Sequence, residues 1–211
     1  MHRAAIALDG KARIVAGSFS RTQEKNRQVA EDLGISSDRC YVTYREMAEK
    51  EAERADGIDF VIIVTPNSSH FEICKAFLEA GIHVVCDRPV TTTYAQAVEL
   101  NRLAKSRNLL FMVTYTYMGN VTVKYARELV RQGAIGDIRV IMAEYPQGQD
   151  AFVERFDPSQ GGWRNDPHFA GNFTEDMIDY PSIKDGAAGL AFIEACLESN
   201  KDGNIWKEMC D

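Results

Sequence analysis

The sequence predicts an α/β protein with a parallel sheet, and three observations point to that class. Two short apolar runs rich in β-branched residues, 60–64 and 82–86, have the length and composition of buried strands. Between them lies a segment with helical spacing of apolar residues, which ends at Gly81. A strand, a helix and a second strand in this order form a unit in which the strands run parallel. We expect helices on both faces of the resulting sheet.

Composition limits the partners and the setting of this chain. Its 211 residues are 45% hydrophobic and 26% charged, which is typical of a globular protein of one large or two small domains. The net charge of -7 argues against nucleic acid as a partner. Five cysteines without a C-x-x-C pair suggest reduced thiols. With no signal peptide and no apolar run of membrane-spanning length, we expect a cytoplasmic protein without a membrane partner or a metal site.

The first sixty residues contain alternating helix and strand signals. Residues 2–8 are Ala-rich and predict a helix, and residues 13–19 predict a strand. A helix over 22–33 follows, and residues 40–42 have the composition of a short strand. The charged segment 44–55 predicts a helix at the surface.

Polar residues follow the two central strands. The first strand is followed by T-P-N-S-S-H, residues 65–70, and the second ends in Asp87, Arg88 and Pro89. In open parallel sheets, ligands bind at the carboxyl ends of the strands. A turn that only caps the next helix is the alternative, because Asn67 and the two serines after it are all good N-cap residues. The sequence therefore predicts either a binding edge or a simple turn here.

The second half of the chain begins with the same alternation. A helix over 94–107 precedes a buried strand over 109–113, and a turn rich in tyrosine follows. A helix over 121–132 and a strand over 138–145 come next. Further on, residues 161–167 read G-G-W-R-N-D-P, a loop shaped by glycine and proline.

These motifs resemble those of a known family. T-P-N-x-x-H followed by a strand that ends in E-K-P or D-K-P is similar to the signature of the Gfo/Idh/MocA oxidoreductases. The resemblance implies a Rossmann-like domain over 1–118, followed by a shortened α+β substrate domain over 119–211. It also implies NAD(P)-dependent hydride transfer to or from a polyol, sugar or related alcohol.

The resemblance assigns cofactor positions to the central motifs. Thr65, Pro66, Asn67 and His70 correspond to positions around the nicotinamide ribose, and residues 87–89 also lie beside the cofactor. The family has lysine where this chain has Arg88, and an X-Pro bond in the cis form at the next position.

The same resemblance suggests catalytic roles for three residues, namely Asp87, Arg88 and His168. A buried lysine exchanges a proton readily, whereas an arginine stays charged, so Arg88 is expected to orient substrate or stabilise an alkoxide. His168 is a candidate substitute for the family's active-site histidine, which has no counterpart later in the sequence.

Ser20 and Arg21 occupy the position at which the family binds the adenosine ribose. An acidic residue there favours NAD, whereas a hydroxyl beside an arginine suits the 2′-phosphate of NADP. We therefore expect NAD or NADP with a slight preference for NADP. The alternative is a pair that only caps the following helix.

Four residues are candidates for substrate contacts. Tyr115 lies where relatives carry an aromatic turn, and Trp163, Arg164 and Asp166 lie in a loop that resembles a substrate-side loop of one subgroup. Tyrosine also simply suits the end of a strand, and the glycine-rich loop is also consistent with a surface turn.

Two family features do not occur in the sequence. A first strand with a G-x-G-x-x-G turn should precede residues 2–8, which implies a chain that begins after its pyrophosphate site. The resemblance also skips part of the second domain after Gly171. A non-catalytic truncated derivative that acts as a binding module is the alternative function, and unpaired sheet edges would favour a homo-oligomer.

Overall fold

The computed structural model describes residues 2–8 and 10–142. Their helices and strands have the following bounds: α1 His2–Ala7, α2 Gln23–Asp32, α3 Tyr44–Glu53, β1 Phe60–Ile63, α4 His70–Glu79, β2 His83–Cys86, α5 Tyr94–Ser106, β3 Phe111–Val113 and α6 Val121–Arg131. Short 3-10 turns lie at Ser37–Arg39, Asn67–Ser69 and Thr116–Gly119.

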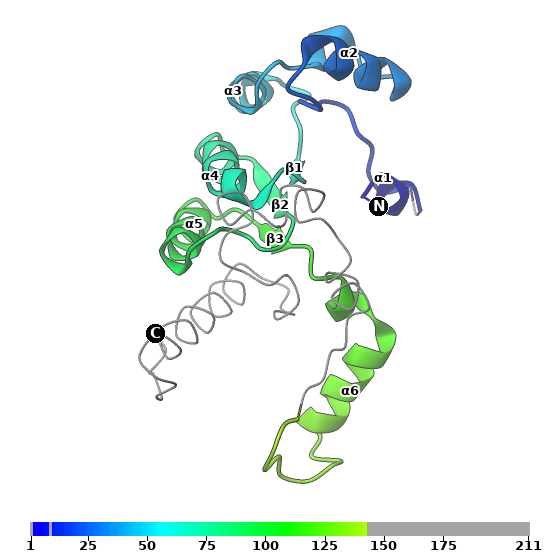
Figure 1. Cartoon of the computed structure of the whole chain (residues 1–211), viewed down its shortest axis with the longest axis vertical. Coiled ribbons are helices and arrows are strands. Elements are labelled where there is room, and N and C mark those ends of the chain that lie inside the picture. The colour runs from blue at the N-terminus through cyan, green and yellow to red at the C-terminus, as the bar shows by residue number, and fades with distance from the viewer. Residues whose placement is uncertain (1, 9, 143–211) are drawn as a thin grey trace, which may run out of the picture.

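The sheet has three parallel strands in the order β1-β2-β3 (Figure 1). Phe60 pairs with His83 in the first ladder, and Val84 pairs with Phe111 in the second. Each strand is joined to the next by a helix, because a parallel connection must carry the chain back to the starting edge. The predicted α/β class with a parallel Rossmann-like sheet is confirmed.

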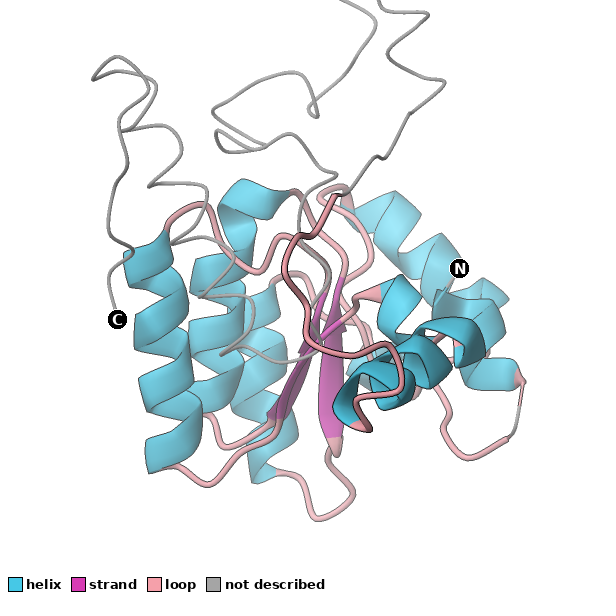
Figure 2. Ribbon diagram, turned by 90° about the horizontal axis from the view of Figure 1, so that it is seen from below, coloured by secondary structure: helices cyan, strands magenta, loops and turns pink. Residues whose placement is uncertain are grey.

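Helix α4 forms the centre of the core. It buries Ile73, Cys74, Phe77 and Leu78 on one side and packs against β1, β2, α3 and α5. Figures 1 and 2 show α4 and α5 on one side of the sheet and α1 on the other. The strands alternate accordingly, so that Val61 and Ile63 are buried whereas Phe60 is exposed.

Local signals explain where the helices begin and end. The Thr43 hydroxyl accepts a hydrogen bond from the Glu46 N–H at 3.2 Å, and the Thr93 hydroxyl accepts one from the Gln96 N–H at 3.3 Å. Both are N-caps that satisfy a free amide of the first turn. Helix α4 ends at Glu79, and Gly81 follows its C-cap with a φ of 81°, a conformation that glycine adopts without a Cβ penalty.

Three predicted strands differ in the structure. Residues 13–19 form no strand, and their pairing with 40–42 is a single parallel bridge between Gly17 and Cys40. A strand needs a neighbour along its length, and none of the described residues lies beside 13–19 on its other edge. Residues 138–142 are likewise irregular, and 143–145 lie outside the described part. The expectation that these segments form strands was wrong for 13–19, 40–42 and 138–142.

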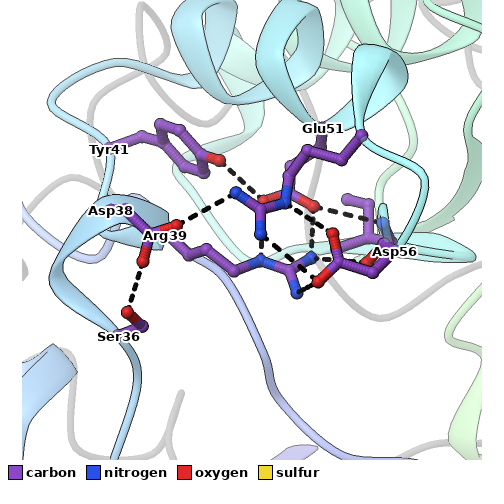
Figure 3. A network of polar contacts seen from close by, with 8 residues as sticks. Ser36, Asp38, Arg39, Tyr41, Glu51 and Asp56 are labelled. Carbon is purple, nitrogen blue, oxygen red and sulfur yellow. Dashed lines mark hydrogen bonds and ion pairs between the residues drawn. The ribbon is translucent and has the colours of Figure 1, made fainter.

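A buried polar network fixes the segment that pairs with Gly17 (Figure 3). The guanidinium of Arg39 donates from Nε to Glu51 at 2.9 Å and also binds the second oxygen of that carboxylate. The Tyr41 hydroxyl donates to Glu51 at 2.7 Å, and the Ile58 N–H donates at 3.2 Å. Burial, together with Glu51, raises the pKa of Tyr41 to about 12, so this hydroxyl remains a neutral donor.

Candidate functional site

The three strands bring their carboxyl ends to one edge of the sheet. The Asp87 N–H donates to the Ile63 carbonyl at 3.0 Å, and the Thr114 N–H donates to the Cys86 carbonyl at 3.0 Å. These bonds continue the two ladders past the last strand residues. The loops that begin at residues 64, 87 and 114 therefore start side by side, as the sequence predicts for a binding edge.

Asp87 is anchored from two directions at this edge. Its Oδ1 accepts a hydrogen bond from the Thr114 hydroxyl at 2.5 Å, and the Nε2 of His2 lies 3.0 Å away. Neither Thr114 nor His2 is among the site residues predicted from the sequence. Thr114 directly follows a predicted strand, so its position could have indicated a residue at the binding edge. No local sequence pattern connects His2 to Asp87.

His70 lies in the interior and is 0% exposed. Its Nδ1 is 2.8 Å from the Pro89 carbonyl and its Nε2 is 2.7 Å from the Thr65 carbonyl. Burial lowers the pKa of His70 and outweighs the two carbonyls, which raise it. A neutral imidazole has one N–H and donates to one carbonyl at a time. His70 thus holds the loop after β1 against the loop after β2.

The remaining predicted residues at the strand ends differ in exposure. Arg88 is exposed at the edge, and the bond to Pro89 is cis, as the family resemblance implies. Asn67 and Tyr115 are buried, at 3% and 7% exposure. Of the residues at this edge, Arg88 therefore presents a permanent positive charge to solvent.

A cavity of about 1480 Å³ lies between residues 10–21 and the segment 58–66. Its lining includes Ser20 and Arg21 from the first wall and Thr65 and Pro66 from the second. Two groups of predicted cofactor residues, separated by more than forty positions in the sequence, thus line one space.

The cavity lining is rich in basic side chains, which are Arg3, Lys11, Arg13, Arg21, Lys25 and Arg39. Aspartates at 56 and 59 are the acidic members of the lining. This excess of positive charge favours an anionic ligand, and a guanidinium is a strong partner for phosphate. Ser20 also accepts a hydrogen bond from the Thr22 N–H at 3.3 Å, so part of its role is to start α2.

Other predicted residues are not part of the cavity lining. Asn67, His70, residues 87–89 and Tyr115 belong to this second group. His2 connects the two groups, because it lines the cavity and contacts Asp87. His168, Trp163, Arg164 and Asp166 lie outside the described residues, so their proposed roles remain predictions.

The polar residues present fit a dinucleotide cofactor. The hydroxyl and guanidinium at positions 20 and 21 suit a phosphorylated ribose, and Thr65 lies at the opposite wall near the strand ends. In the described part of the chain, no cluster of three or more His, Cys, Asp and Glu side chains is arranged to hold a metal ion. None of the described helices is long and apolar enough to cross a membrane.

Comparisons with known proteins agree with this geometry. Residues 1–115 match the model of the oxidoreductase family with an NAD-binding Rossmann fold. An uncharacterised oxidoreductase of Bacillus subtilis, YfiI, is 40% identical over 173 residues, which are 81% of this chain and 44% of that protein. A D-xylose 1-dehydrogenase (NADP⁺) of Hypocrea jecorina is 30% identical over 183 residues, or 83% of this chain and 44% of that enzyme.

Solved structures extend the likeness to three dimensions. The crystal structure of an inositol dehydrogenase homolog from Azotobacter vinelandii, complexed with NAD⁺, has a TM-score of 0.73 and 38% identity. The match covers 81% of this chain and 44% of that one. The chain thus spans less than half the length of these relatives. Because the family model covers more than half of it, the chain belongs to the Gfo/Idh/MocA oxidoreductase family and carries that family's NAD-binding Rossmann fold.

Proposed function

We propose that this chain is the nicotinamide-binding portion of an NAD(P)-dependent oxidoreductase acting on a polyol, sugar or related alcohol. One observation carries the proposal: the carboxyl ends of the parallel strands border a basic cavity lined by Ser20, Arg21, Thr65 and Pro66. Ligands of open parallel sheets bind at that edge. A relative from Azotobacter vinelandii, 40% identical with a TM-score of 0.63, is complexed with NADH and myo-inositol.

In this proposal, each group at the edge has a distinct task. Arg21 binds a phosphate or ribose oxygen from one wall of the cavity, and Thr65 lies near the nicotinamide end. Asp87, held by Thr114 and His2, keeps the loop after β2 in place and accepts hydrogen bonds from a polar ligand. When bound, NAD(P) accepts or supplies a hydride at the substrate carbon.

Arg88 is proposed to stabilise negative charge on the substrate oxygen. A guanidinium stays protonated throughout the working range of pH and donates in a fixed planar geometry. It therefore binds a developing alkoxide without taking its proton. Tyr115, Trp163, Arg164 and Asp166 remain the proposed substrate contacts, and His168 remains the proposed proton acceptor. A cytoplasmic setting and a homo-oligomeric state also remain proposals.

Nicotinamide fluorescence during titration with NADH and NADPH tests the cofactor claim. Saturable binding is expected, with NADPH favoured, because Arg21 pairs with the additional phosphate. Arg21→Ala should weaken NADPH binding about 10- to 100-fold, as expected for a lost charged hydrogen bond, with a smaller effect on NADH.

The matched control is Arg27→Ala, because Arg27 is exposed on α2 and pairs with Glu31 instead of lining the cavity. It should leave both affinities unchanged. A folded protein that binds neither nucleotide would contradict the proposal. Equal losses for the two arginine variants would show that only bulk charge attracts the nucleotide.

A further inference from the structure

His2 is in contact with both the cavity and the solvent. Its side chain is 34% exposed and belongs to the cavity lining. The other histidines that the structure describes differ from it. His70 is 0% exposed with a carbonyl oxygen at each ring nitrogen, and His83 accepts a hydrogen bond from the Leu110 N–H at 3.1 Å and is not part of the lining. Of the described histidines, His2 is therefore the one placed to exchange a proton between the cavity and water.

Asp87 orients the imidazole of His2. The Nε2 of His2 lies 3.0 Å from the Oδ1 of Asp87, and the Thr114 hydroxyl donates to the same oxygen at 2.5 Å. An ionised carboxylate only accepts, so Nε2 carries the proton of this contact. In the neutral ring, Nδ1 is then the nitrogen that can accept a proton. A carboxylate in this position fixes the tautomer of the ring and stabilises the imidazolium when it forms.

The proposed reaction releases a proton that has to reach water. Oxidation of an alcohol breaks the C–H bond, whose electron pair leaves as hydride to the nicotinamide. It also breaks the O–H bond, whose electron pair completes the carbonyl, so one proton is released for each hydride. Arg88 directly follows Asp87 and stays charged, so it does not carry this proton. His2 contacts the residue next to Arg88 and can accept and release a proton at neutral pH.

We propose that His2, oriented by Asp87, is a proton relay between the cavity and solvent. Nδ1 takes the proton released in the cavity, which forms an N–H bond on the ring, and the imidazolium then gives this proton to water. Each cycle ends with neutral imidazole and carboxylate, so the relay needs no further reactant. The inference rests on the proposed function. It leaves His168 in its proposed role, because a relay passes on the proton that a first acceptor takes from the substrate.

Chemical rescue of the full chain tests the relay. The substrate is whichever of myo-inositol and D-xylose the wild-type chain oxidises with NADP⁺, since relatives bind or are named for these compounds. His2→Ala should lower kcat about 100-fold, the size of a lost proton-transfer group. Its affinity for NADPH should stay close to that of the wild type, because the nucleotide binds without proton transfer.

Added imidazole should restore turnover of the His2→Ala variant. In a series of substituted imidazoles, the restored rate should rise with base strength, as expected for proton transfer and not for a molecule that only fills space. The matched control is His83→Ala, which removes a half-buried histidine outside the cavity lining. This control should keep the wild-type rate and should not respond to imidazole.

The possible results separate the relay from the proposed function. An active wild type with an equally active His2→Ala variant would overturn the relay alone. So would a loss of rate that imidazoles restore independently of base strength, since His2 would then only position Asp87. A folded wild-type chain that oxidises neither substrate would contradict the proposed function and the relay with it.

Nitrogen-15 spectra of the wild-type histidines give a check that needs no variant. If His2→Ala fails to fold, these spectra decide the question. The relay requires neutral His2 to carry its proton on Nε2, because Asp87 accepts there and Nδ1 has to remain open. A neutral His2 with its proton on Nδ1 would overturn the proposal.

Discussion

Arg88 is the residue at which this chain differs most in chemistry from the family pattern that it otherwise follows. The T-P-N-S-S-H and D-R-P segments lie at adjacent strand ends, and Arg88 is exposed at this edge. A lysine there can lose its proton when it is desolvated, whereas an arginine cannot. We therefore propose that Arg88 orients substrate and that another group moves the proton.

Arg88→Lys should consequently increase turnover. If a lysine restores proton exchange at this position, kcat for NAD(P)⁺-dependent oxidation of a polyol should rise about 100-fold. The rate of the lysine variant should also increase with pH as the amine loses its proton. Arg88→Met is the control, which removes the charge without supplying a proton acceptor. A lysine variant no faster than the methionine variant would contradict this assignment.

Buried His70 stabilises the fold, and its contribution can be measured from the pH dependence of the free energy of unfolding. Its folded-state pKa is lowered by burial, whereas the unfolded chain has the ordinary value of about 6.5. Below that pH the unfolded state binds the proton more readily than the folded state. The stability contributed by neutral His70 is therefore present above about pH 6.5 and is lost as the pH falls toward the lower folded value.

Replacing His70 by asparagine should lower the free energy of unfolding by about 2 kcal/mol, because buried carbonyls lose their donor. It should also flatten the decrease in stability between about pH 6.5 and pH 5. Denaturant melts across this range measure both effects. His83→Asn, at a half-buried position on β2, should retain the pH dependence. An unchanged pH slope in the His70 variant would refute this role.

At the scale of elements, the Arg39–Glu51 pair joins the segment 36–41 to α3. The Glu51 side chain is 0% exposed and accepts from Arg39, Tyr41 and the Ile58 N–H. Pairing with Glu51 raises the pKa of Arg39. Removing one member of a buried ion pair leaves its partner charged and unpaired, which is more destabilising than losing a surface pair.

Glu51→Ala should therefore lower the free energy of unfolding by about 3–5 kcal/mol. Glu46→Ala, which removes the exposed partner of Lys50 on the same helix, should cost less than about 1 kcal/mol. Thermal and urea melts of the two variants provide the comparison. Similar small losses for both would show that the buried network contributes little.

The central strand–helix–strand unit could be predicted because its signals are local. The apolar runs at 60–63 and 83–86, the helix between them and the glycine that ends it all lie within thirty residues. The strand at 13–19 could not be predicted correctly from its composition. Strand formation depends on a neighbouring backbone, and that neighbour does not lie among the described residues.

In the candidate site, too, the features with local sequence signals could be predicted, whereas those that depend on distant residues could not. The T-P-N and D-R-P loops follow from strand ends that the sequence reveals, whereas the cis bond at Pro89 was expected only from the family resemblance. The contact between His2 and Asp87 joins positions far apart in the sequence, with no local signal. The interior position of His70 also depends on tertiary structure. The local sequence around a histidine in a first helical turn does not distinguish one that faces solvent from one that faces the next loop.

At the scale of the whole molecule, the proposed cofactor site lies where the parallel strands end at one edge of the sheet. The adjoining cavity has basic and hydroxyl side chains suited to a dinucleotide. The central claim is that the loops after β1 and β2 bind the nicotinamide cofactor.

Hydrogen–deuterium exchange of the full chain with saturating NADPH tests that claim most directly. Exchange should slow in residues 64–70 and 87–92, which form the two loops after β1 and β2, and should remain unchanged in 121–131 of α6, which belongs to neither loop. A folded chain whose exchange is unchanged in both loops, or is slowed only at other segments, would contradict the account.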